Sequence, residues 1–165
     1  MEKGRFEYRK ATKEDIVRIQ EIYAFAREQM RKTGNPNQWG DNKPPLETIM
    51  SDIKNGNLIL ICNPDICGVF SFTIGLEKTY SIIENGKWLN DDKYGVIHKV
   101  ASAGNNCGIM EAVLFYCEKK IGNIRIDTHN DNKIMQHILE KNGYVKCGRI
   151  YVEDGSPRIA YQKVN

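Results

Sequence analysis

The sequence has no long hydrophobic run, no strong excess of charge of one sign and only three histidines. Nothing in it approaches the length of a membrane-spanning helix, so we expect no membrane partner. The first ten residues, MEKGRFEYRK, contain no apolar segment, which argues against a secretory signal. The net charge of +3 comes from scattered lysines and arginines among acids, which disfavours a nucleic-acid partner. These absences predict a cytoplasmic protein.

The cysteines lack the pattern of a metal site or of a disulfide framework. There are five, an odd number, and they lie singly in or near apolar stretches: Cys62, Cys67, Cys107, Cys117 and Cys147. Isolated thiols of this kind suit a reducing compartment. The nearest pair has no second pair and no histidine run beside it, so we expect no metal.

Neither internal repeats nor a linker divide the chain, and its length suits a single domain over residues 1–165. Periodicity and turn signals predict strands at 5–11, 57–63, 65–75, 94–101, 123–128, 144–152 and 157–164. Apolar stripes predict helices around 16–30, 46–53, 109–117 and 134–139, separated in two places by irregular stretches at 33–45 and 76–92. The order β-α-α-β-β-β-α-β-α-β-β predicts an α/β (α+β) fold, a mixed, twisted central sheet with helices on both faces.

Small and amide residues separate the strand at 94–101 from the helix that follows it. A helix N-terminus leaves its first N–H groups unpaired and attracts anions. Gly104 and Gly108 would let backbone N–H groups approach a diphosphate closely. The residues alone leave two interpretations open: an anion site, or a plain strand-to-helix turn, which glycines also favour.

Two stretches of the chain resemble the GNAT-type N-acetyltransferases, and the resemblance extends over residues 5–163. One stretch is VIHKVASAGNNCGIMEAVLFYCEK, at the position of that family's pyrophosphate loop. The other is IRIDTHNDNKIMQHILEKNGYVKCG, the more specific of the two. Its residues in register with the family are Asp127, Thr128, Asn132, Met135, Glu140, Lys141, Gly143 and Tyr144.

The resemblance implies that acetyl-CoA binds between two diverging parallel strands, here 96–101 and 123–128. Backbone groups of Val100 and Ala101 would bond the pantetheine arm, and an N–H near Val100 would stabilise the oxyanion of the transition state. The remaining implied cofactor contacts are Gly104, Asn105, Asn106, Cys107, Gly108, Ile109, Met110, Asn132 and Met135. An uncharged amine would attack the thioester directly, without a covalent enzyme intermediate.

The chain departs from the family pattern at three positions. Asn105 is shorter than the Gln or Arg that usually begins the loop, and Met110 stands where Gly or Ala is usual. Leu139 occupies the position of a Tyr that often protonates the leaving thiolate, a role that Tyr144 or Tyr151 could take instead. These departures keep a rival open: a GNAT-fold acyl-CoA-binding module with weakened catalysis.

His98 is the candidate general base. On a regular strand its neighbours Ile97 and Lys99 would point to the other face of the sheet, so His98 would face one side alone. An imidazole there could accept a proton from the incoming ammonium, although a half-buried strand histidine bonded to a carbonyl is the alternative. We expect His129 in a polar turn and His137 on the outward side of its helix.

Candidate acceptor contacts come from the irregular stretches and the strand after them. They are Gln38, Trp39, Trp88 and Tyr94, which could form an aromatic-walled site for a small amine. Packing of the same rings into the core is the equal alternative. The sequence therefore predicts transfer from acetyl-CoA to a primary amine of a metabolite, amino acid or antibiotic-like compound. Protein N-termini or side chains are a lesser option, as are a purely structural role and a homodimer formed through the C-terminal hairpin or a sheet edge.

Overall fold

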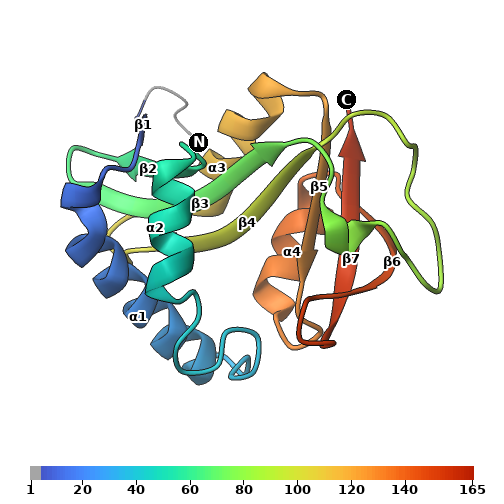
Figure 1. Ribbon diagram of the computed structural model, residues 1–165, viewed down its shortest axis with the longest axis horizontal. Helices are drawn as coiled ribbons and strands as arrows, with labels where there is room; N and C mark the ends of the chain where they lie inside the picture. Colours follow the sequence, from blue (N-terminus) through green and yellow to red (C-terminus); the bar gives the residue numbers. More distant parts are fainter. Residues whose placement is uncertain (1–4) are drawn as a thin grey trace.

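A seven-stranded mixed sheet, in the order β1-β2-β3-β4-β5-β7-β6, forms the centre of the computed structural model, which describes residues 5–165 (Figure 1). The strands are β1 (Glu7–Lys10), β2 (Leu58–Cys62), β3 (Ile66–Ile74), β4 (Gly95–Ser102), β5 (Asn123–Thr128), β6 (Val145–Tyr151) and β7 (Pro157–Val164). The helices are α1 (Ile16–Lys32), α2 (Leu46–Lys54), α3 (Ile109–Lys120) and α4 (Lys133–Lys141), with short 3-10 turns η1 (Lys13–Asp15) and η2 (Lys78–Tyr80). This is the element order that the sequence predicts.

The one parallel pair among the described strands, β4 with β5, is short. Gly95 to Ile97 of β4 lie opposite Ile124 to Ile126 of β5, and the pairing stops there. Beyond that point β4 stays with β3 as far as Ser102, while β5 stays with β7 as far as Thr128. Figure 1 shows the two strands close at one end and apart at the other. The expected divergence of these strands is confirmed.

A β-bulge interrupts β4 directly after His98. The register on β3 advances from Ser71 to Val69 while β4 advances from His98 to Ala101, so β4 carries an extra residue. Lys99 adopts a left-handed conformation, with φ of 56°. Its ammonium pairs with Asp52 of α2 at 2.9 Å, which brings it to the same face of the sheet as His98. The expectation that Lys99 points to the opposite face is wrong, because the bulge breaks the alternation.

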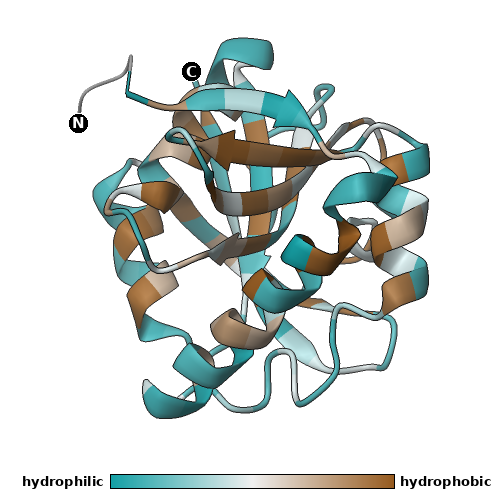
Figure 2. Cartoon of the chain, turned by 90° about the vertical axis from the view of Figure 1, so that its left-hand side faces the viewer, coloured by the Kyte–Doolittle hydropathy of each residue, from teal (hydrophilic) through white to brown (hydrophobic). Residues whose placement is uncertain are grey.

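The helices pack on the two faces of the sheet as the apolar pattern of β2 requires. Leu60 joins a buried cluster with Ile19 of α1 and Ile49 of α2, while its neighbour Ile61 joins Val113 of α3 on the other face. Figure 2 shows hydrophobic β2 beside the hydrophilic edge strand β1. Within residues 5–165, no helix is both long enough and apolar enough to cross a lipid bilayer.

The segment 75–94 covers the rest of the face occupied by α1 and α2. Although it has little regular structure, buried polar groups of β5 and β7 hold its second half. Asn123 donates to the side chain of Asn90, and Arg125 donates to the Asn90 carbonyl at 2.7 Å. Gln162 accepts from the Leu89 N–H at 2.7 Å. This anchoring fixes the position of η2 beside β4.

Candidate active site

His98 lies just beyond the last residue of β4 that pairs with β5, and a group of polar side chains surrounds it. Its Nε2 atom is 3.3 Å from the Tyr80 hydroxyl of η2 and 3.5 Å from the Asp127 carboxylate of β5. The Tyr80 hydroxyl donates to the same Asp127 oxygen at 2.6 Å. On the other side of the ring, Nδ1 is 3.9 Å from Glu77 Oε1. We call these four residues the His98 cluster.

The environment fixes the charge states of two members of the cluster. Burial alone would raise the pKa of Asp127, but hydrogen bonds from His98 and Tyr80 and the charge of Arg158 outweigh it and lower that pKa. Burial, together with the adjacent Asp127 charge, raises the pKa of Tyr80 well above its usual value of 10. Asp127 is therefore an anion that accepts, and Tyr80 a phenol that donates.

The α1–α2 connection, residues 33–45, contacts the C-terminal part of the chain through Gln38. Gln38 Oε1 accepts from Asn132 Nδ2 at 3.0 Å and from Asn35 Nδ2 at 2.9 Å. The Gln38 carbonyl accepts from the buried Arg158 at 3.1 Å. Asn132 also caps α4, since its side-chain oxygen accepts from the Met135 N–H. Gln38 thus links the α1–α2 connection to the N-terminus of α4 and to β7.

The turn before α3 exposes a row of backbone donors. Within residues 5–165, none of the N–H groups from Asn105 to Met110 donates a hydrogen bond. Gly108 is the N-cap of α3 and adopts φ of 77°, and Gly104 adopts φ of 85°. A Cβ on Gly104 would lie 2.6 Å from the ring of Phe25, so this close approach requires glycine. The turn therefore has the geometry of an anion site.

The three departures from the family pattern have simple structural outcomes. Met110 is buried in the core between the sheet and α3, so its side chain points away from the exposed turn. Leu139 is fully buried in the same core. The Asn105 side chain accepts from Asn106, whose own oxygen accepts from Arg5 at 2.6 Å. Neither Met110 nor Leu139 therefore projects into the space in front of the α3 N-terminus.

A buried tyrosine orients the peptide bond that follows the bulge. The Tyr23 hydroxyl, on α1, donates to the Lys99 carbonyl at 2.8 Å. Because the C=O and N–H of a trans peptide point in opposite directions, the Val100 N–H points away from α1. Val100 itself packs against the core on the α3 side. The Tyr23 contact, on the α1 side of the sheet, thus orients the Val100 N–H that is expected to stabilise an oxyanion.

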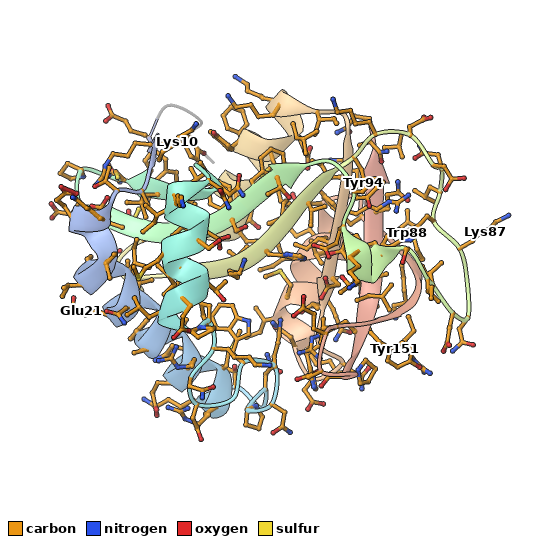
Figure 3. All side chains as sticks on the ribbon, viewed as in Figure 1. Lys10, Glu21, Lys87, Trp88, Tyr94 and Tyr151 are labelled. Atoms are coloured by element: carbon orange, nitrogen blue, oxygen red, sulfur yellow. The ribbon has the colours of Figure 1, made fainter. Side chains whose placement is uncertain are left out.

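The aromatic residues proposed as acceptor contacts occupy different surroundings. Trp39 packs edge-on against Tyr23, with ring centroids 5.5 Å apart. Trp88 and Tyr94 enclose the Arg125 guanidinium, at 4.1 and 4.0 Å from its carbon. Figure 3 shows Trp88 and Tyr94 on the inner side of the 75–94 segment, whereas Lys87 projects outward. Both rings are thus committed to internal packing, and we leave them out of the proposed acceptor site.

The other polar candidates lie elsewhere. The Tyr144 hydroxyl donates to Glu118, and the Tyr151 hydroxyl donates to Glu84, so neither belongs to the His98 cluster. His129 Nδ1 accepts from the Asp131 N–H in its turn, and His137 is exposed on α4. Cys107 is exposed beside the α3 N-terminus, whereas the other four cysteines are buried.

Neither of two surface cavities coincides with the His98 cluster. One, of about 500 Å³, lies between α2 and the N-terminal end of α1 and is lined by Ala11, Thr12, Lys13, Glu14, Ile16, Met50, Ile53 and Lys54. The other, of about 470 Å³, lies beside Asn105. The polar side chains converge instead where β4 and β5 diverge. In the part of the chain described, no group of His, Cys, Asp and Glu side chains could hold a metal ion.

Sequence reasoning missed most of the His98 cluster. Tyr80 and Glu77 lie in a segment without periodicity, and no motif marks them. Asp127 falls in the stretch that carries the family resemblance, but the resemblance assigns its side chain no role. The pattern around Arg158 indicates only a strand of the C-terminal hairpin. The adjacent Asp127-Thr128 pair, at the end of a strand beside the gap, was the one available signal.

A scan against protein-family models finds no matching family, and a search of curated proteins finds no matching protein.

Solved structures do match over nearly the whole chain. A GNAT-family acetyltransferase from Streptococcus agalactiae 2603 is 31% identical with a TM-score of 0.87, covering 97% of this chain and 95% of its own. A second, from Listeria monocytogenes 4b F2365, is 18% identical with a TM-score of 0.72 and the same two coverages. The structure of yncA from Salmonella typhimurium, with its cofactor acetyl-CoA, is 14% identical with a TM-score of 0.58, covering 97% and 94%. The last two similarities concern the fold alone.

Proposed function

The chain belongs to the GNAT family of acetyl-CoA-dependent acyltransferases, and we propose that it transfers the acetyl group to a primary amine of a small molecule. The observation that carries this proposal is the position of His98. It lies where β4 and β5 part, and the Asp127 carboxylate reaches it from the other strand. A proton acceptor is thereby available beside the gap in which the resemblance puts the thioester.

The chain's own residues fit acetyl-CoA in three places. The unpaired N–H groups from Asn105 to Met110 suit a diphosphate. The edge of β4 at Val100 and Ala101 no longer pairs with β5, so its backbone groups are available to the pantetheine arm. At the end of β5, the buried Thr128 hydroxyl has no partner within residues 5–165. Bound there, acetyl-CoA would supply the acetyl thioester.

Two groups would act on the reaction. His98 would accept a proton from the acceptor amine, a contribution of about 10²- to 10⁴-fold for a positioned base. The Val100 N–H, oriented through the Tyr23 contact with the preceding carbonyl, would stabilise the oxyanion. Leu139 supplies no acid, so the chain holds no counterpart of the usual tyrosine on α4.

The α1–α2 connection supports a small acceptor rather than a protein chain. Gln38 is bonded to α4 and β7, and Lys43 pairs with Asp154 of the β6–β7 turn at 3.1 Å. These contacts hold residues 33–45 against the N-terminus of α4, β7 and the β6–β7 turn. An extended peptide would have to displace them, whereas a small amine would not.

The test is acetyl transfer itself. We would incubate the protein with acetyl-CoA and a panel of primary amines and detect acetylated amines by mass spectrometry. His98→Gln should lower kcat by about 10²-fold or more, while His137→Gln, at the exposed histidine of α4, should leave it unchanged. Failure to acetylate any amine faster than acetyl-CoA hydrolyses would refute the proposed function. Equal rates for the two variants would remove His98 as the base.

A further inference from the structure

The His98 cluster contains two hydrogen-bond acceptors that face each other with no donor between them. We propose that Glu77 and His98 form a binding site for the ammonium group of the acceptor, and that Asp127 fixes the His98 tautomer that this site requires. The inference rests on the proposed function and extends it, since it specifies a protonated amine as the form that binds.

The proton on the His98 ring can be assigned by counting donors. The Tyr80 hydroxyl has one proton, and it is used at 2.6 Å on Asp127 Oδ2. His98 Nε2 therefore faces the Tyr80 oxygen at 3.3 Å and the Asp127 oxygen at 3.5 Å, and both are acceptors toward it. A ring nitrogen facing two acceptors must carry the proton itself. In the neutral ring, Nδ1 is then an unprotonated acceptor.

Glu77 presents its second acceptor to this nitrogen. Its Oε2 accepts from both the N–H and the hydroxyl of Thr79, at 3.1 and 3.0 Å, which fixes the carboxylate. The other oxygen, Oε1, lies 3.9 Å from His98 Nδ1. Both side chains are partly open to solvent, with 25% of Glu77 and 31% of His98 exposed. An ammonium group has three donors and can bond both acceptors at once.

The surrounding charges favour a cation. Two carboxylates, Glu77 and Asp127, face His98 from the 75–94 segment and from β5. Two cations lie on the same side of the sheet. Arg158 on β7, whose charge acts on Asp127, is buried and its terminal nitrogens donate to the carbonyls of Pro157 and Gln38, while the Lys99 ammonium is paired with Asp52. Both carboxylates would repel an anionic acceptor, and an acceptor group without a hydrogen-bond donor would leave Glu77 Oε1 unpaired.

The group transfer balances with the residues at hand. One ammonium proton passes to His98 Nδ1, and Asp127 stabilises the imidazolium through Nε2. The free amine nitrogen forms a bond to the thioester carbon, and the carbon–sulfur bond breaks. A second N–H proton of the same nitrogen ends on the sulfur, giving the amide and the free thiol. His98 then releases its proton to water.

Nitrogen NMR tests the tautomer without any turnover. The chain has three histidines, so long-range proton–nitrogen spectra of labelled protein can be assigned with His98→Gln. We expect His98 with its proton on Nε2, and n-butylammonium should perturb Nδ1 in the wild type but not in Glu77→Gln. n-Butanol should not perturb His98 Nδ1 in either protein. A proton on Nδ1 in the neutral ring, or equal responses to the two probes, would overturn the proposal.

Kinetics with any amine that is acetylated separate the two carboxylates. Glu77→Gln should raise the KM for the amine about 10- to 100-fold, with the KM for acetyl-CoA unchanged. The matched control is Asp92→Asn, an exposed carboxylate of the same segment, which should change neither. An unchanged amine KM in Glu77→Gln would overturn the site while leaving the proposed function intact.

Asp127→Asn should act on the base instead. Without the carboxylate the imidazolium is less stable, so the acid limb of the kcat/KM profile should move to lower pH, with a lower plateau. In Glu77→Gln, by contrast, kcat should reach the same plateau as in the wild type. A uniform loss of rate with an unshifted limb would mean that Asp127 serves the fold alone and would refute its positioning role.

Discussion

The bulge in β4 predicts an inverted response to two substitutions at Lys99. Lys99→Ala and Lys99→Gly remove the same contact with Asp52, so the two variants differ only in the backbone they allow. At an ordinary strand position glycine is less stable than alanine by about 0.5–1 kcal/mol. Here the residue has φ of 56°, where an L side chain costs roughly 1–2 kcal/mol. The glycine variant should therefore be the more stable of the two.

The size of the difference follows from these opposing terms. Relief of about 1–2 kcal/mol, less the extra entropy that glycine loses, leaves roughly 0.5–1 kcal/mol in favour of glycine. For a chain of this length, 1 kcal/mol corresponds to about 2–4 °C in Tm. In urea, with a slope of about 2 kcal/mol per molar, it corresponds to about 0.5 M in the midpoint.

Equilibrium urea unfolding of the two variants, followed by circular dichroism, measures the difference directly. Equal slopes would show that the variants unfold from comparable native states, so that the midpoints can be compared. If Lys99→Ala proves as stable as Lys99→Gly, or more so, the left-handed conformation is absent in solution. The orientation of the Val100 N–H, which depends on this Lys99 conformation and on the Tyr23 contact, would then be wrong as well.

Three further predictions concern other contacts. Gly104→Ala should weaken acetyl-CoA binding in calorimetric titration, because its methyl would meet Phe25 at 2.6 Å; adding Phe25→Ala should restore part of the loss. Tyr23→Phe should lower kcat with little change in the acetyl-CoA KM, and should cost about 1–3 kcal/mol in urea unfolding because it leaves a carbonyl unpaired. Hydrogen bonds from Arg9 lower the pKa of Asp15 from 3.8 to about 2, so its stabilisation is complete above about pH 4 and is lost as pH falls through 2. Asp15→Asn should therefore lower the free energy of unfolding at pH 7 by about 1 kcal/mol after screening, with no difference from wild type below pH 2.

Local patterns in the sequence were sufficient to predict the helices and strands, whereas the divergence of β4 and β5 followed from the family resemblance. Apolar stripes and glycine stops are local signals, and the regular helices and strands follow them. The bulge is different, because a left-handed Lys99 inside VIHKVA leaves no mark on the alternation. It depends on Tyr23 and Asp52, which reach β4 from α1 and α2.

The His98 cluster escaped prediction for the same reason. Tyr80 reaches His98 because contacts of Trp88 and Arg125 hold the aperiodic segment 75–94 against β5. Trp88 donates to the Tyr80 carbonyl at 2.9 Å, and its ring packs on the guanidinium. Such contacts join residues far apart in the chain, which spacing alone cannot reveal. The two interpretations of Trp88, packing or acceptor wall, were equal in the sequence because both require a partly buried ring.

The uneven exposure of the thiols has a practical consequence. Cys107 alone among the five is accessible, and it stands one residue before the N-cap of α3. A maleimide dye should label this single position and report on the arrival of a phosphorylated ligand by a change in emission. The same accessibility means that colorimetric thiol reagents would titrate the protein along with released CoA, so turnover is better followed by the loss of thioester absorbance.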